Sequence, residues 1–233
     1  MSLNQETIVN NKKVFCDLVR SIQREGADIE GLIKYLEESD FFIAPASTIY
    51  HNNVDGGLCD HCLNVYYQFV QLVMTQYPNM VKEVEQEDGT KRSILDFTET
   101  PITHETALIV TLFHDLSKAN YYEKTFRNKK VYNEDGKQKD ANGRYDWVSQ
   151  QAFAVKPARD RFLFGTHEET SEFMLRQFIP LSHEESIAIL HHTGPVSGRD
   201  GYNFTPIYTT CKLAAWLHAA DFLAAMTLET TYE

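Results

Sequence analysis

The chain has 233 residues, of which 42% are hydrophobic, and its formal net charge of −11 at pH 7 disfavours binding to a long nucleic acid. A chain of this size buries one sizeable core, which favours a single domain over two full ones. Because it has neither an apolar run of membrane-spanning length nor an apolar N-terminal signal, we expect a cytoplasmic protein without membrane partners.

The first 40 residues predict two helices. Apolar residues between positions 8 and 22 recur at helical spacing, and Gly26 ends this first helix. Asp28 is placed to cap a second, shorter helix. Both helices are expected to pack on the remainder of the chain.

The central part of the chain predicts two core helices joined by a polar linker over residues 83–100. A glycine pair opens the first helix, whose apolar face includes His61, so this histidine is expected to point inward. Its CDHC segment has the spacing of a zinc or redox site, but no second pair completes such a site and buried thiols are expected. The second helix is apolar nearly all round before His114, which is typical of a central core helix.

Residues 121–156 lack the helical pattern and predict a small β-hairpin insertion. Turn signals flank two expected short strands, Lys130–Tyr132 and Arg144–Val148. Residues 118–161 hold eleven Lys and Arg against six Asp and Glu, a local charge of +5 that leaves −16 for the rest. This segment favours attraction of a small anionic substrate, although a solvated surface insertion explains it equally well.

Two capping-box sequences mark the starts of later helices. Thr166 is followed by Glu169, and Ser182 is followed by Glu185, at the spacing that lets side chains bond the first backbone amides. A final helix rich in Ala and Leu is expected over residues 206–228.

These elements together predict an all-α fold, a helical bundle with a small β-hairpin insertion. The helices of residues 1–40 would pack on a core domain of residues 41–233, with the insertion at about 121–156.

Histidine and aspartate residues recur about once per predicted helix, at helix ends or on inward faces. In chain order they are His61, His114 with Asp115, His167, His191 with His192, and Asp221. A single histidine on an apolar face is more often a hydrogen-bonded core residue than a ligand. Several on facing helices instead form the kind of site that holds divalent metals in helical bundles.

The ordered pattern H…HD…H…HH…D resembles that of the HD-domain metal-dependent phosphohydrolase superfamily, and HDLSK at residues 114–118 looks like its signature HD-x-x-K segment. The stretch FFIAPASTIYHNNVDGGLCDHCLNV is also similar to the first ligand region of bacterial and phage members, where a Gly-Gly pair precedes the helix with the first histidine. The resemblance runs from about Phe41 to Met226.

The resemblance implies that His61, His114, Asp115 and Asp221 bind one metal ion. Asp115 would bridge to a second ion held by His167 and one histidine of the HHTG segment. His192 aligns better with the family's pattern, and His191 is then a supporting ligand or a substrate contact. The ions would be one or two of Mn, Fe, Ni, Co or Zn.

Other residues are assigned to the substrate. Lys118 is expected to meet a phosphate oxygen beside the metal and to act with Asp115 in catalysis, although a lysine there also complements a helix dipole. His51 and Arg127 are candidate substrate contacts, and His218 is a candidate partner that orients Asp221.

The implied function is hydrolysis of a phosphomonoester or phosphodiester, in a nucleotide or similar small phosphorylated substrate, by metal-activated water. Three alternatives remain open at this point. They are a non-haem di-iron oxygenase on the same ligands, an HD-type exonuclease, and a binding module that has lost turnover.

Overall fold

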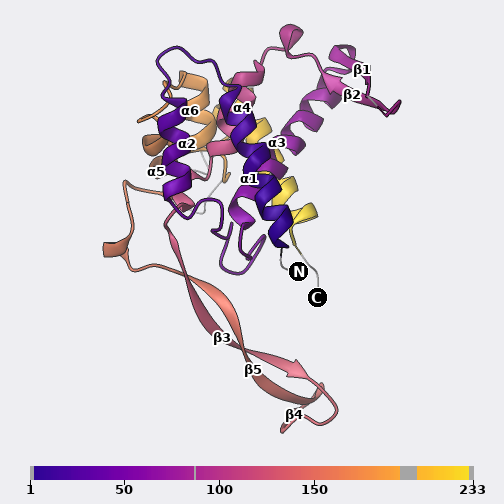
Figure 1. The fold of residues 1–233 in the computed structure, drawn as a ribbon, viewed down its shortest axis with the longest axis vertical. Coiled ribbons are helices and arrows are strands. Elements are labelled where there is room, and N and C mark those ends of the chain that lie inside the picture. Colours follow the sequence, from indigo (N-terminus) through magenta and orange to yellow (C-terminus); the bar gives the residue numbers. More distant parts are fainter. Residues whose placement is uncertain (1–2, 87, 195–203, 231–233) are drawn as a thin grey trace.

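The computed structural model of the chain describes residues 3–86, 88–194 and 204–230. The helices are α1 (Gln5–Arg20), α2 (Ile29–Glu38), α3 (Gly57–Gln76), α4 (His104–Phe113), α5 (His167–Leu175), α6 (His183–Leu190), α7 (Phe204–Thr210) and α8 (Lys212–Leu223). The strands are β1 (Val81–Glu85), β2 (Lys91–Leu95), β3 (Tyr122–Tyr132), β4 (Gln138–Asp140) and β5 (Gly143–Val155). The helices gather into one body, from which β3, β4 and β5 extend as a long arm (Figure 1).

The prediction of an all-α fold is wrong, because 17% of the chain is strand against 50% helix. Strands β1 and β2 form one antiparallel sheet, and β3, β5 and β4, in this order, form a second. The fold is therefore mixed, although mostly helical.

The sequence analysis missed β1 and β2 and the full length of the arm's strands, because these strands are largely exposed. Strand β2 lies within the expected polar linker and β1 overlaps its start, and β2 contributes only Leu95 to the core. The arm was expected in the right segment, yet β3 and β5 pair over eleven residues each, far beyond the predicted strands. A strand exposed on both faces lacks the alternating pattern that reveals a half-buried one.

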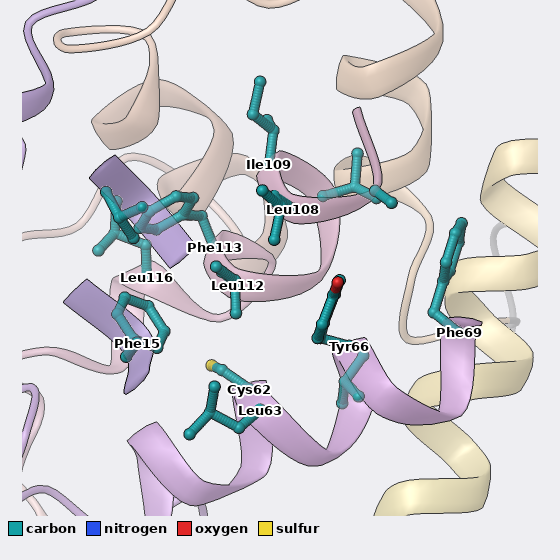
Figure 2. Close-up of a cluster of buried hydrophobic side chains, with 14 of the residues drawn as sticks. Phe15, Cys62, Leu63, Tyr66, Phe69, Leu108, Ile109, Leu112, Phe113 and Leu116 are labelled. Carbon is teal, nitrogen blue, oxygen red and sulfur yellow. The ribbon is translucent and has the colours of Figure 1, made fainter. Parts of the chain in front are cut away.

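Helix α4 lies at the centre of the hydrophobic core, as predicted. All residues from Ala107 to Phe113 are buried. They pack against Cys62 and Leu63 of α3 and against Phe15 of α1, whose ring meets that of Phe113 edge to face at 5.8 Å (Figure 2). Burial of each large side chain contributes about 1.5–3 kcal/mol, so α4 is a firmly fixed element, and it ends directly at His114.

The predicted N-terminal helix caps are confirmed, whereas α1 ends at Arg20 and not at Gly26 as expected. The Asp28 side chain accepts a hydrogen bond from the Gly31 amide at the start of α2. Both capping boxes are present, with Thr166 at the start of α5 and Ser182 at the start of α6.

The last predicted helix is broken rather than continuous. Extended backbone at Cys211 separates α7 from α8, and a π-helical turn, Ala224–Leu228, follows α8. No helix of the described residues is both long and apolar enough to span a bilayer.

Candidate metal centre

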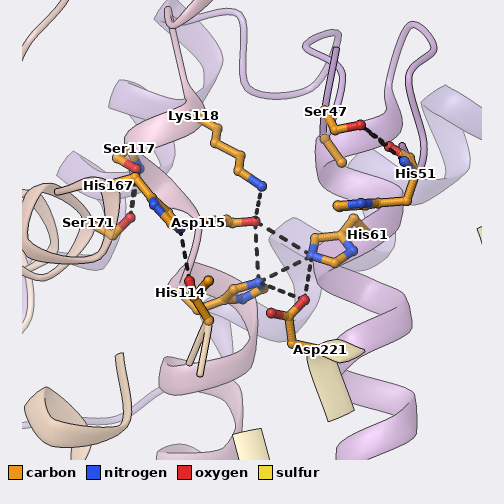
Figure 3. Close-up of polar contacts among 12 residues, drawn as sticks. Ser47, His51, His61, His114, Asp115, Ser117, Lys118, His167, Ser171 and Asp221 are labelled. Carbon is orange, nitrogen blue, oxygen red and sulfur yellow. Dashed lines mark hydrogen bonds and ion pairs between the residues drawn. The ribbon is translucent and has the colours of Figure 1, made fainter. Parts of the chain in front are cut away.

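Polar side chains from five helical segments converge inside the helical body (Figure 3). They comprise His61 of α3, His114 and Asp115 after α4, His167 of α5, His192 after α6 and Asp221 of α8. His61 and His114 are fully buried, and Asp115 is only 2% exposed. The structure thus brings together the six residues that the sequence analysis assigned as metal ligands.

Two glycines bring the preceding loop against the start of α3. Gly56 caps this helix with a φ of +79°, a conformation that glycine adopts without steric cost. A Cβ on Gly57 would lie 2.1 Å from the carbonyl oxygen of Asn52. The close approach places the ring of His51 4.9 Å from that of His61, centroid to centroid.

Backbone carbonyls orient two of the histidines. The Nδ1–H of His114 donates to the Thr111 carbonyl at 2.8 Å, and the Nδ1–H of His192 donates to the Ile189 carbonyl at 2.7 Å. In the neutral form of each ring, these hydrogen bonds place the proton on Nδ1. The Nε2 atoms, which face the cluster, therefore offer lone pairs to a cation.

His61 is oriented by a carboxylate. Its Nδ1 lies 2.9 Å and 3.1 Å from the two carboxylate oxygens of Glu229, so Nδ1–H donates to Glu229. The Nε2 atom of His61 then faces the Nε2 atom of His114 at 3.2 Å. Two imidazole lone pairs at this distance repel each other unless a proton or a metal cation lies beside both.

Asp115 lies between two sets of histidines. Its Oδ2 accepts a hydrogen bond from Lys118 Nζ at 2.6 Å and lies 3.4 Å from His114 Nε2. Its Oδ1 is 3.6 Å from His192 Nε2 and 3.8 Å from His167 Nε2. This oxygen is buried without a hydrogen-bond partner among the described residues, as expected of an oxygen that coordinates a cation.

The proton affinities show that the cluster attracts positive charge. Burial alone would lower the pKa of His61, but the carboxylates of Glu229 and Asp221 outweigh burial and raise the pKa to about 10. Burial would raise the pKa of Asp115, yet Lys118 and His114 hold it well below its usual range. The pKa of Asp221 is also lowered, because its hydrogen bond to His61 outweighs burial. Both aspartates are therefore ionised and available as ligands.

The ligand atoms form overlapping sets of three whose members lie within 4.8 Å of one another. Asp115 shares one set with His61 and His114, and another with His167 and His192; a third set joins Asp221 to His114 and His192. Mixed imidazole and carboxylate donors suit Mn, Fe, Co, Ni and Zn. The cluster can therefore hold a divalent metal ion.

Two predicted substrate contacts adjoin the cluster. Lys118 ends the 3-10 turn Leu116–Lys118, and its side chain is 16% exposed. Both ring nitrogens of His51 are buried without a hydrogen-bond partner among the described residues. Burial lowers the pKa of His51 to about 4, so the ring is neutral at pH 7.

Three other predicted residues lie outside the cluster. Arg127 is on β3 of the arm and donates to the Phe153 carbonyl at 3.2 Å. His191 is half-buried at the end of α6, where its carbonyl accepts a hydrogen bond from Tyr208 at 2.6 Å. The ring of His218 bonds the His192 carbonyl at 2.8 Å, so it supports the His192 segment.

Glu229 was missed by sequence reasoning. It follows Asp221 by eight residues, and an ideal α-helix would rotate it about 80° away from that aspartate. The wider π-helical turn Ala224–Leu228 lies between the two and changes this rotation. No signal in the sequence marks such a turn.

The cysteines of the CDHC segment are free and buried, which confirms the expectation of buried thiols. Within the described residues, no cysteine belongs to a set of potential metal ligands.

Comparison of the chain with protein-family models, with curated proteins and with solved structures finds no match.

Proposed function

We propose that the protein is a metal-dependent phosphohydrolase that cleaves a phosphate ester, in a nucleotide or similar small substrate, at the buried His and Asp cluster. The observation that carries this proposal is the pair of Nε2 atoms of His61 and His114, which face each other at 3.2 Å while both Nδ1 atoms are already bonded. This arrangement favours a cation at that point. The ordered likeness to HD-domain phosphohydrolases points to the same residues.

One ion would be held by His61, His114, Asp115 and Asp221, and a second by Asp115 with His167 and His192. When bound, a divalent ion acidifies a water molecule and neutralises charge on a phosphoryl group. The protein's own contribution is to hold the ligands rigidly, since carbonyls and Glu229 fix the imidazoles before any ion arrives.

Lys118 and His51 complete the proposed site. Burial opposes the charge of Lys118, but the Asp115 carboxylate at 2.6 Å outweighs it and raises the lysine pKa, so the ammonium stays charged. A buried ammonium beside the ligands suits a phosphate oxygen. The neutral His51 ring, with both nitrogens unpartnered among the described residues, can hydrogen-bond a substrate oxygen.

The test is phosphate release by the full chain loaded with Mn²⁺, and then with the Fe, Co, Ni or Zn ion in its place. Substrates are nucleoside mono-, di- and triphosphates, cyclic nucleotides and an activated phosphodiester. We expect turnover that Asp115→Asn lowers by about 10³-fold or more. Asp17→Asn, the same chemical change at a 56% exposed side chain of α1, is the matched control and should retain activity.

Two results would overturn the proposal. One is metal binding by the folded protein without hydrolysis of any substrate. The other is oxygen uptake by the Fe²⁺-loaded protein in place of hydrolysis, which would favour the di-iron oxygenase.

A further inference from the structure

Among the described residues, the arm formed by β3, β4 and β5 contributes no potential ligand to the metal cluster. Figure 1 shows it extending away from the helices, and most residues of β3 and β5 are exposed or half-buried. A ribbon of two or three strands is marginally stable by itself unless one face is covered. The arm therefore presents a surface that another molecule can cover.

One face of the arm is aromatic. Directly paired residues of antiparallel strands share a face, and the pairs Phe126 with Gln151, Lys130 with Trp147, and Tyr132 with Tyr145 all lie on this one. Phe126 is 73% exposed, Trp147 53% and Tyr132 46%. We call these six residues the aromatic face.

The rings near the distal end are held in place. The ammonium of Lys130 lies 4.1 Å from the centroid of the Tyr145 ring and forms an ion pair with Asp140 at 2.6 Å. The Trp147 ring meets that of Tyr145 edge to face at 6.0 Å. Rigid, exposed aromatic side chains are typical of the core of a protein interface.

We propose that the aromatic face packs on the body of a second copy of this chain, in a dimer in which each copy places its arm on the other. Charge complementarity supports this occupant. Residues 121–156 hold eight Lys and Arg against five Asp and Glu, so the arm carries +3, and the net charge of −11 leaves −14 on the rest of the chain. The arm of one copy is thus attracted to the body of the other.

The body offers an apolar partner surface beside the base of the arm. Ile49 is 55% exposed and Tyr50 76% exposed. Their loop is tied to the arm by the hydrogen bond from Tyr122 to the Ala46 carbonyl and by the ion pair of Lys124 with Asp55 at 2.8 Å. If two arms run antiparallel about a two-fold axis, the distal rings of each reach this loop of the partner.

The size of the surface is sufficient for a dimer. Eleven paired residues span about 35 Å, and two strands with their side chains are about 10 Å wide, which gives about 350 Å² per face. Two arms on two bodies would bury about 1,400 Å² in total, within the range of specific interfaces.

A nucleic acid fits the arm less well. Three of the eight basic residues, Lys124, Lys130 and Lys156, already form ion pairs with carboxylates of the same chain. The remaining positive excess is small beside the charge of a duplex.

The test is sedimentation velocity of the full chain at concentrations from about 1 to 100 µM. We expect a dimer that dissociates at high salt and that Phe126→Ser or Trp147→Ser weakens by about 10-fold or more. No ring contact joins Phe126 to another described residue, so its replacement leaves the arm folded, as far-UV circular dichroism should verify. Val148→Ser, a 40% exposed residue on the opposite face, is the matched control and should leave the dimer unchanged.

Three outcomes contradict the proposal. The first is that the chain sediments as a monomer at every concentration. The second is that neither aromatic substitution changes the dissociation constant of the dimer. In the third, the monomer binds a labelled oligonucleotide through the arm, with Phe126→Ser reducing that affinity.

Discussion

The carboxylate of Glu229 should determine how tightly the cluster binds metal, although it is not itself assigned as a ligand. Its side chain is 1% exposed and accepts the Nδ1–H of His61 at 2.9 Å, while Asn64 donates to it at 3.1 Å. The carboxylate fixes the tautomer of His61 and increases the basicity of its Nε2. Glu229→Gln keeps the size of the side chain and one acceptor oxygen, but removes the charge.

A charge-assisted hydrogen bond is roughly twice as strong as a neutral one, and loss of such a supporting group typically costs 10- to 100-fold in metal affinity. We expect Glu229→Gln to weaken Mn²⁺ binding by about 10-fold, at the lower end of this range, because the amide oxygen still accepts a hydrogen bond from His61. Glu229→Ala, which leaves His61 without this partner, should weaken it by about 100-fold.

Isothermal titration calorimetry with Mn²⁺ measures both effects directly, and it does not depend on turnover. Glu30→Gln, the same chemical change on the exposed side of α2, is the control and should bind like wild type. If both Glu229 variants are folded and bind Mn²⁺ within about twofold of wild type, Glu229 has no role in preparing His61.

Two further predictions concern the framework around the cluster. Gly57→Ala should lower the free energy of unfolding by about 1–3 kcal/mol, because its Cβ would meet the Asn52 carbonyl and displace the loop of His51. The same displacement should reduce turnover in the hydrolase assay. A chemical denaturation midpoint equal to that of wild type would contradict this prediction. Glu185 is fully buried and bonded to Arg24 through both guanidinium Nη atoms, so although burial would raise its pKa, the arginine lowers it. A carboxyl with a lowered folded-state pKa adds stability above its unfolded pKa of about 4.3 and loses it as the pH falls. Thermal unfolding should therefore show Glu185→Gln less stable than wild type by about 2 kcal/mol at pH 7, and this difference in stability should close towards pH 3. Glu184→Gln, at an exposed neighbour, is the control and should be almost as stable as wild type. A stability difference for Glu185→Gln that stays constant with pH would rule out this role of the charge.

The cluster could be predicted because its residues lie at positions that sequence patterns reveal. The all-apolar segment before His114 identifies a core helix, and a polar residue at the end of such a helix is necessarily near the interior. The capping box at Thr166 places His167 in the first turn of α5. Each of these inferences concerns one segment of the chain. The expectation that the segments meet at one site came from the ordered likeness to HD-domain proteins.

What could not be predicted depends on exposed or irregular backbone. The strands of the arm bury almost no residue, so their pairing leaves no alternation in the sequence. The contribution of Glu229 depends on a π-helical turn, which removes the regular period on which helical patterns rest.

Arg24 connects the N-terminal helices to the geometry of the cluster. Its guanidinium, in the turn after α1, bonds Glu105 at the start of α4 and Glu185 at the start of α6. These two helices end at His114 and just before His192, respectively. Because a helix of ten residues is about 15 Å long and stiff, fixing its start restricts where its last residue lies. The α1 segment, whose Phe15 also packs on Phe113, thus holds the two helices that aim these imidazoles at Asp115. Loss of the hydrogen bonds of Arg24 should therefore lower the metal affinity of the cluster as well as the free energy of unfolding.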